Sequence, residues 1–521
     1  MLANGGKSGT DRGLDVGVAA FVLAAVVAAV AGAAVPWAWA IVVVTLVAAA
    51  CVVRLGATTV LLHALVLSMF FESVAVGEVR VGRLLAVVVP VYVLFRLLRG
   101  WRPGRIPGAV WLPAALFAVW AWASGLWATS DAAWQASLGA IGLAAAYFLG
   151  FATLVDSPAQ IRELLRTYVL GAAGVALLAM AQAGVDVRSV GLQGDPNIFA
   201  LYQVAAIPAV GMLARTAKVP WQRLAWLLLI LPLTASVFAS QSRGGLLSLA
   251  VVLPVALVRG DFGRIVRGHT VFAMGATTVV LGVLGGIAGR IDDRLSVEAI
   301  LRDQGTGRLD IWLAAWHGYL SNPLLGLGAG GFQPQSSWLL ETTPGVGLSP
   351  DSAYFRTGIK VHNVYLETLA ELGPVGLLLW LAILAGTVVL ILRVAGAAVR
   401  STPASALLPM LFAFAVATLF LSVTNNKLLW MVVGISAAAA SARFRTVPDL
   451  EGPSIGWWGD RPLTGPGGEG PAGIARRDPT RAFITYSARA ESVRRSPIAG
   501  EGRPVPGDRG KTTNARTGSA S

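Results

Sequence analysis

Two arginines and a histidine in a largely apolar chain have neighbours that suit phosphate chemistry. Arg243 lies in the sequence Ser240-Gln-Ser-Arg-Gly-Gly245 between two apolar runs, where a serine hydroxyl can cap the helix that follows. Arg308 stands at the start of a second run with helical apolar spacing. Backbone N–H groups at a helix N-terminus favour an anion, and a guanidinium binds phosphate oxygens in bidentate fashion. Together the arginines predict a diphosphate site, although contact with lipid phosphates explains Arg243 equally well when it is taken alone.

The histidine is His362, which directly precedes another predicted helix start. Asn363 can cap this short helix, Gly373 can end it, and Pro374 suits the first position of the next apolar run. A histidine at this place could accept a proton from a sugar hydroxyl near neutral pH. Taken alone, an ordinary structural histidine is the better interpretation. The two arginines favour the catalytic interpretation, because the charge pattern described below places them on the same side of the membrane as His362.

The composition indicates a membrane protein. The 521 residues are 55% hydrophobic and 13% charged, whereas soluble domains carry about 25% charged residues. The formal net charge of +14 comes with arginines in short connections and in the C-terminal tail. This distribution favours cytoplasmic loops and anionic lipid headgroups over nucleic acid as the partner. The single cysteine, Cys51, excludes an internal disulfide and a cysteine-based metal site.

Apolar runs long enough to cross a bilayer predict an all-α polytopic membrane protein of about 12–14 transmembrane helices. The expected spans lie near 16–35, 37–53, 57–71, 82–98, 108–127, 133–154, 167–184, 198–214, 221–239, 244–258, 270–288, 374–393, 404–423 and 427–441. Together they form a membrane domain over residues 1–445. Residues 446–521 are rich in Pro, Gly and Arg and predict a disordered cytoplasmic tail.

The connections between these runs are alternately rich and poor in arginine. Those at 96–105, 162–166 and 259–267 are rich in arginine, whereas 185–197 holds only Arg188. Because cytoplasmic loops carry the excess of Lys and Arg, both termini are expected in the cytoplasm of a multi-pass cell-membrane protein. The same alternation places the long segment 289–363 and the turn around Arg243 outside the membrane.

The segment 289–363 predicts two surface helices, starting near Arg308 and Asn363, with a glycine loop between them. The loop contains Gly326, Gly328, Gly330 and Gly331. Such a loop could admit a ligand close to the backbone or form a tight packing turn. It is not a phosphate-binding P-loop, because no Gly-Lys-Ser/Thr follows.

Five motifs in this part of the chain occur together in a fixed order. They are Gly194-Asp-Pro-Asn-Ile-Phe-Ala200, Ser240-Gln-Ser-Arg-Gly-Gly245, Gly307-Arg308 with Trp312, Asn322-Pro-Leu-Leu-Gly-Leu-Gly328, and His362-Asn363 with Glu367. The ordered set on a polytopic chain resembles the O-antigen ligase and O-antigen polymerase superfamily of bacterial membrane glycosyltransferases. The resemblance covers roughly residues 190–430.

The resemblance implies a C-type membrane glycosyltransferase that inverts the anomeric centre and uses neither metal nor other cofactor. Such an enzyme takes a glycan from undecaprenyl diphosphate and joins it to the hydroxyl of a glycan or glycoconjugate acceptor outside the membrane, in cell-surface polysaccharide or cell-wall assembly. By motif, Arg243 and Arg308 bind the diphosphate and His362 acts as the base or orients the acceptor. Further substrate-binding candidates are Asp195, Asn197, Ser242, Asn363 and Glu367. Ligase and polymerase stay open as alternatives.

Two other classes of protein compete with this interpretation. A transporter or flippase for lipid-linked glycans needs a polar path through the membrane and inverted halves, and the sequence indicates neither. Ionisable residues are also nearly absent from the expected spans, whereas proton-coupled transporters place them at mid-membrane. A non-catalytic membrane scaffold would have no need of paired arginines at helix starts.

Overall fold

The computed structural model describes the chain in eight stretches, which are residues 51–53, 55–72, 75–76, 79–182, 189–258, 307–348, 358–394 and 403–441. The expected spans near 16–35 and 270–288, most of the one near 37–53 and the tail from residue 446 lie outside the described residues. The same holds for 289–306 and 349–357 of the long segment.

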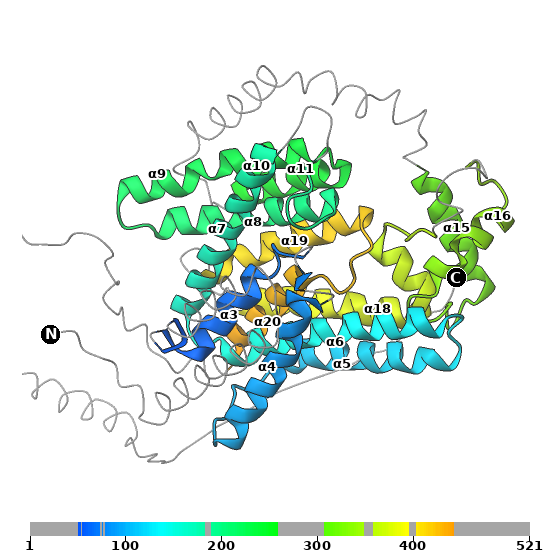
Figure 1. Cartoon of the computed structure of the whole chain (residues 1–521), viewed down its shortest axis with the longest axis horizontal. Coiled ribbons are helices and arrows are strands. Elements are labelled where there is room, and N and C mark those ends of the chain that lie inside the picture. Colours follow the sequence, from blue (N-terminus) through cyan, green and yellow to red (C-terminus); the bar gives the residue numbers. More distant parts are fainter. Residues whose placement is uncertain are drawn as a thin grey trace, which may run out of the picture. The chain divides into compact units, whose positions relative to one another are not determined.

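Apart from one small hairpin, the regular elements among the described residues are all helices (Figure 1). The elements before residue 190 are α3 (Ala57–Leu67), β1 (Ala75–Val76), β2 (Val79–Arg80), α4 (Val81–Leu98), α5 (Gly108–Ala123), η1 (Ser124–Leu126), α6 (Asp131–Leu154) and α7 (Pro158–Gln182). Those after it are α8 (Pro196–Thr216), α9 (Pro220–Leu228), α10 (Ile230–Ala239), α11 (Arg243–Val258), α15 (Arg308–Ser321), α16 (Phe332–Thr342), α18 (Val364–Val394), η2 (Pro403–Ala406), α19 (Leu407–Ala417), η3 (Thr418–Phe420) and α20 (Lys427–Ala440). The two strands pair antiparallel, Ala75 with Arg80 and Val76 with Val79.

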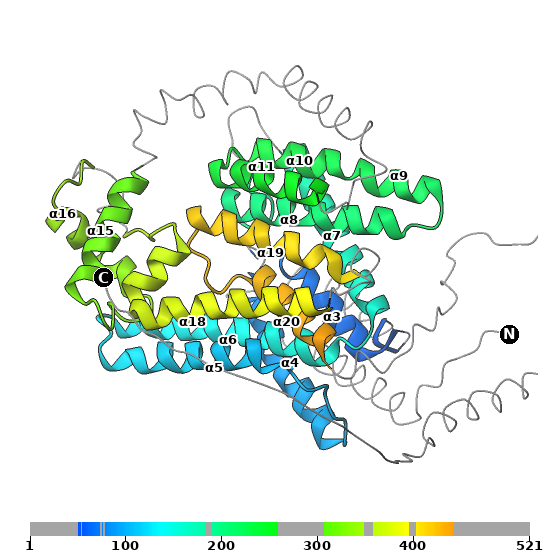
Figure 2. The ribbon, with the colours of Figure 1, turned by 180° about the vertical axis from the view of Figure 1, so that it is seen from behind.

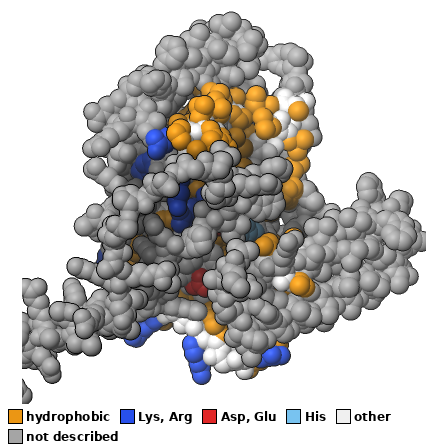
Figure 3. Space-filling model, turned by 90° about the vertical axis from the view of Figure 1, so that its left-hand side faces the viewer, with side chains coloured by type: hydrophobic (Ala, Val, Ile, Leu, Met, Phe, Trp, Pro, Cys, Tyr) orange, Lys and Arg blue, Asp and Glu red, His pale blue; other side chains and the backbone are white. Residues whose placement is uncertain are grey.

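Seven helical stretches within these residues are long and apolar enough to cross a membrane. The predicted all-α polytopic membrane fold is therefore confirmed. Large apolar side chains on α4, such as Val87, Val91 and Leu98, are exposed, as expected where a helix faces lipid. On the face drawn in Figure 3, most of the visible hydrophobic side chains of the described part gather in the upper half of the surface, and smaller groups lie below them.

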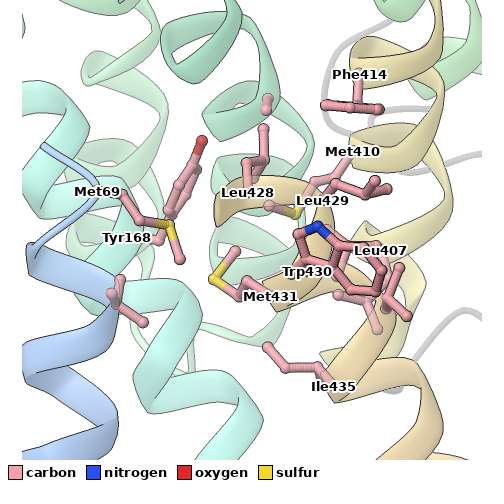
Figure 4. Close-up of a cluster of buried hydrophobic side chains, with 14 of the residues drawn as sticks. Met69, Tyr168, Leu407, Met410, Phe414, Leu428, Leu429, Trp430, Met431 and Ile435 are labelled. Atoms are coloured by element: carbon pink, nitrogen blue, oxygen red, sulfur yellow. The ribbon is translucent and has the colours of Figure 1, made fainter. Parts of the chain in front are cut away.

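Helix α8 is the central helix of this bundle. Every residue from Phe199 to Ala214 is buried, because α7, α9, α10, α11 and α19 all pack against it. A helix that is apolar on all sides is stable only when it is surrounded in this way. Beside it, α19 and α20 contribute Met410, Phe414, Leu428 and Met431 to one buried cluster (Figure 4). The burial of α8 begins at Phe199, within its first turn, and this packing fixes the start of the helix.

Helix α18 consists of two helices that meet at Gly373. This glycine has φ of 65° and ψ of −170°, and a Cβ on it would lie 2.4 Å from the carbonyl oxygen of Leu324. Only glycine fits such a position. The predicted helix stop at Gly373 is confirmed, so a short helix over 364–372 precedes the apolar run that begins at Pro374.

The prediction of only two surface helices within 289–363 was wrong. A further helix, α16, begins directly after the glycine loop and packs with α15 and α18 (Figure 2). The three elements share a second, smaller core that includes Ile311, Phe332 and Leu339. The described part of the long segment thus packs, together with the start of α18, around its own apolar cluster.

Candidate functional site

The first part of the site joins the starts of α8 and α11. Asp195 caps α8, since its Oδ1 accepts from the backbone N–H groups of Asn197 at 2.7 Å and Ile198 at 3.0 Å. Ser242 donates its hydroxyl to Asn197 Oδ1 at 2.7 Å and accepts from the Gly245 N–H at 3.0 Å. The predicted serine cap is therefore present. It ties two motifs 45 residues apart and places Arg243 at the first turn of α11.

Phe420, at the end of η3, brings the two arginine-bearing helix starts together. A Cβ on Gly244 would lie 3.0 Å from the Cβ of Phe420. The Arg308 guanidinium carbon lies 5.7 Å from the centre of the same ring, within the range of a cation–π contact. The ring of Trp312 lies 6.2 Å from it. Arg308 and the residue next to Arg243 therefore meet at one aromatic side chain.

His362 is held at the mouth of α18 by its backbone. Its N–H donates to the hydroxyl of Ser422 at 2.8 Å, and Trp312 Nε1 donates to the carbonyl of the preceding residue, Val361, at 3.1 Å. The φ of His362 is 55°, which is uncommon for a residue other than glycine. Asn363 caps the helix through its Oδ1, which accepts from the N–H groups of Tyr365 at 3.0 Å and Leu366 at 3.1 Å.

The charges around His362 show that three separate elements meet there. Burial lowers the pKa of its imidazole below the usual value, and the positive charge of Arg308 lowers it further. The carboxylate of Asp195 raises this pKa, and Lys360 lowers it. The lowered pKa favours the neutral imidazole, which is the form that can accept a proton. Asp195 from the start of α8, Arg308 from α15 and His362 lie within electrostatic range of one another.

The glycine loop is a packing turn. Glu371 on α18 accepts from the N–H groups of Gly330 at 2.8 Å and Phe332 at 3.3 Å. A Cβ on Gly328 would lie 2.6 Å from the Cα of Ala128. The loop backbone is thus pressed against the α5–α6 connection, and two of its donors serve a carboxylate of the protein itself. Of the two interpretations that the sequence left open, the structure supports packing.

Glu367 and the backbone of His362 share Ser422 as a hydrogen-bonding partner. The Ser422 hydroxyl that accepts from the His362 N–H also hydrogen-bonds the Glu367 side chain. Glu367 and Ser422 line a cavity of about 860 Å³ between α6, α16, α18 and the connection before α20. The eight candidate residues thus lie at two adjoining places. Asn363 and Glu367 are at the start of α18, and the other six are Arg243, Arg308, His362 and the residues at the α8 and α11 starts, Asp195, Asn197 and Ser242.

Sequence reasoning missed Phe420, Ser422 and Lys360. The first two lie at the end of an apolar run, where Ser422-Val-Thr-Asn-Asn426 interrupts it with polar residues. That interruption in a chain with few polar residues was the signal that could have found them. Within the described ranges, no three His, Cys, Asp or Glu side chains are grouped closely enough to hold a metal ion.

One comparison with known protein families bears on this geometry. Residues 226–381 match the family model for O-antigen ligase. The match confirms the predicted resemblance to the O-antigen ligase superfamily, and the matched segment contains Arg243, Arg308, His362 and Glu367. Asp195 and Asn197 lie before the matched segment in the sequence. The Asn197 side chain contacts that segment through the hydrogen bond from Ser242. A comparison with curated proteins found no match.

The O-antigen ligase segment indicates in general terms what the protein does. It points to an enzyme of glycan ligation or polymerisation, with a lipid-linked glycan and an acceptor as partners. The apolar helices and this segment together indicate a multi-pass membrane protein.

Proposed function

We propose that the protein transfers a glycan from an undecaprenyl diphosphate carrier to an acceptor hydroxyl on the outer face of the membrane, without a metal ion. The observation that carries the proposal is the meeting of Arg308, Asp195 and His362 next to the Arg243 helix start. The outer location is supported by the alternation of arginine-rich and arginine-poor connections along the chain.

The reaction follows from the charges of these groups. The neutral imidazole of His362 takes the proton of the acceptor hydroxyl, and the oxygen attacks the anomeric carbon of the donor. The bond from that carbon to the diphosphate oxygen breaks on the opposite face, which inverts the configuration. Arg243 and Arg308 stabilise the negative charge that develops on the leaving diphosphate, as fixed cations do in a preorganised site. Asp195 stabilises the imidazolium that forms at His362.

The test is glycan transfer by purified protein in lipid nanodiscs, with a purified lipid-linked oligosaccharide as donor. We expect Arg243→Ala, Arg308→Ala and His362→Ala each to lower the rate by about 10²–10³-fold. Arg166→Ala is the control, because the half-exposed Arg166 side chain pairs with Glu163 on its own helix. Near-normal transfer by Arg243→Ala would refute the diphosphate assignment.

The product pattern decides between the two activities that share this donor chemistry. A ladder of lengths identifies a polymerase, and a single addition identifies a ligase. A lipid-linked glycan that crosses the bilayer without any transfer product would point to a flippase. Accessibility of cysteines placed at residues 243 and 308 to a membrane-impermeant thiol reagent tests whether the site faces outward.

A further inference from the structure

The exposed face of helix α15 is apolar along almost its whole length. Before the terminal Ser321, every exposed side chain of this helix is large and apolar, and these side chains are Leu309, Leu313, Trp316 and Leu320. Their spacing places them on one side of the helix. The acidic Asp310 of the same helix, by contrast, is only 5% exposed. This is the reverse of the arrangement expected for a helix whose outer face meets water.

Helix α16 packs with α15 around the same small core but has a different outer face. Its exposed residues are Gln333, Pro334, Trp338, Glu341 and Thr342. Amide, carboxylate and hydroxyl groups thus predominate there, as on an ordinary water-exposed surface. The outer faces of these two neighbouring helices therefore suit different surroundings.

The apolar face of α15 continues into the surface of a membrane-spanning stretch. Directly after α15, Leu324 and Leu325 are 74% and 41% exposed. The carbonyl of Leu325 accepts from Trp127 Nε1 at 3.3 Å, beside Leu126, which is 89% exposed. Leu126 ends the apolar stretch Gly108–Leu126, which is long enough to cross a membrane. The exposed apolar side chains of that stretch are therefore followed, across this contact, by those of α15.

The contacts of Leu324 place the end of α15 at the boundary of the bilayer. A Cβ on Gly373 would lie 2.4 Å from the Leu324 carbonyl oxygen, and the apolar run of α18 begins at the next residue. In Figure 1, α15 and α16 lie at one end of α5, α6 and α18. The aromatic pair Trp316 and Tyr319, with ring centres 5.2 Å apart, is of the kind that favours the region between lipid and water.

We propose that α15 lies in the headgroup region of the membrane leaflet on the side of the candidate site, with Leu309, Leu313, Trp316 and Leu320 in contact with lipid. A lipid surface is the occupant that also explains why the apolar face adjoins that of a membrane-spanning stretch. Arg308, the first residue of α15, is then at the level of the lipid phosphates. If the protein has the proposed function, on which this last step rests, a lipid-linked diphosphate reaches Arg308 by moving within the leaflet.

A nitroxide spin label tests the lipid contact without reference to any reaction. The full chain with Cys51→Ala has no other cysteine, so Leu313→Cys and Leu320→Cys each add a single site for the label. The labelled protein is placed in vesicles of phosphatidylethanolamine and phosphatidylglycerol. Thr342→Cys on α16 is the matched control, because Thr342 is exposed on the face that suits water.

Collisions with oxygen, which dissolves in lipid, and with a nickel chelate, which stays in water, distinguish three outcomes. The labels on α15 should collide with oxygen and be protected from nickel, and the label at residue 342 should show the opposite. Collision of the α15 labels with nickel would show that this face meets water. Protection from both reagents would show that protein covers it, such as a second copy of this chain. Either of these two results would overturn the proposal.

The route of the donor is tested by transfer kinetics in the same vesicles. Leu313→Glu puts a charge into the lipid contact and should raise the KM for the lipid-linked donor about tenfold with kcat unchanged. Leu313→Phe and the α16 control Thr342→Glu should keep the wild-type KM. An unchanged donor KM in Leu313→Glu would overturn the route through the leaflet. Absence of transfer by the wild type would count against the proposed function, whereas the spin-label result does not depend on it.

Discussion

The contact between α8 and α11 allows the position of Arg243 to be perturbed without changing any polar residue. A Cβ on Gly245 would lie 2.5 Å from the Cβ of Ala200, whereas ordinary contact begins at 3.4 Å. In Gly245→Ala one of the two helices must therefore give way, and ordinary contact is restored when they separate by about 0.9 Å at this point. That displacement stretches the Ser242–Asn197 hydrogen bond of 2.7 Å beyond the normal range.

The expected effect on function is larger than the effect on stability. Overpacking by one methyl group costs about 1–3 kcal/mol, which a helix as deeply buried as α8 can absorb without unfolding. A misplacement of about 1 Å in a reacting group can lower the rate about 10²-fold. Thermal unfolding in detergent and the rate of glycan transfer at saturating substrates measure the two effects separately.

Two further variants test whether the added methyl group acts through its contact with Ala200. Gly174→Ala adds the same methyl group to α7, where nothing lies within 4 Å; it should leave transfer unchanged and stabilise the helix by about 0.5–1 kcal/mol. Ala200→Gly should restore transfer to Gly245→Ala, because it removes the atom that the new methyl group meets. If Gly245→Ala transfers glycan within threefold of the wild-type rate, or if Ala200→Gly brings no rescue, the geometric explanation is wrong.

The remaining predictions concern charged side chains and metal ions. Because Arg308 lowers the pKa of His362 and Asp195 raises it, Arg308→Gln should move the acid limb of the transfer rate to higher pH and Asp195→Asn should move it to lower pH. NMR titration of the four histidines, with His362→Gln for assignment, checks both directions. Lys427→Met leaves the Glu72 carboxylate without its partner at 2.9 Å and should destabilise the protein by about 3–5 kcal/mol; Glu72→Gln in addition should recover part of this, and thermal unfolding measures both. Incubation with EDTA should leave transfer unchanged, so a loss that Mg²⁺ or Mn²⁺ restores would contradict the metal-independent mechanism.

The helix starts could be predicted from the sequence because capping is local chemistry. Asp195, Ser242 and Asn363 each satisfy backbone N–H groups two or three residues away, and such patterns are visible in a short window of residues. Helix α16 was missed because its sequence, Phe332-Gln-Pro-Gln-Ser-Ser, starts after a glycine-rich loop and contains an early proline. Proline in the first turn of a helix is tolerated, so this signal for a loop was misleading.

The partners contributed by Phe420 and Ser422 could not be predicted in the same way. They reach the site only because α19 packs against both α8 and α11, and nothing in a local window indicates which spans are neighbours. Apolar spans are nearly uniform in composition, and the packing between them depends on small differences in shape. The sequence therefore indicated which residues could react, and the packing of the helices determined which other residues stand beside them.

The polar residues of the site have both a structural and a chemical task, and this follows from the apolar surroundings. Where a helix ends in or near a membrane, its unpaired N–H groups need partners from the protein itself. Asp195 uses one carboxylate oxygen for this purpose and still acts electrostatically on His362. Helix starts that must carry acceptors for their own stability thus also bring charge to the reacting groups. A substitution such as Asp195→Ala would remove both effects, whereas Asp195→Asn keeps the capping oxygen and removes only the charge. The comparison of these two variants separates the structural from the chemical contribution, and transfer by Asp195→Asn equal to that of the wild type at every pH would show that Asp195 is only a cap.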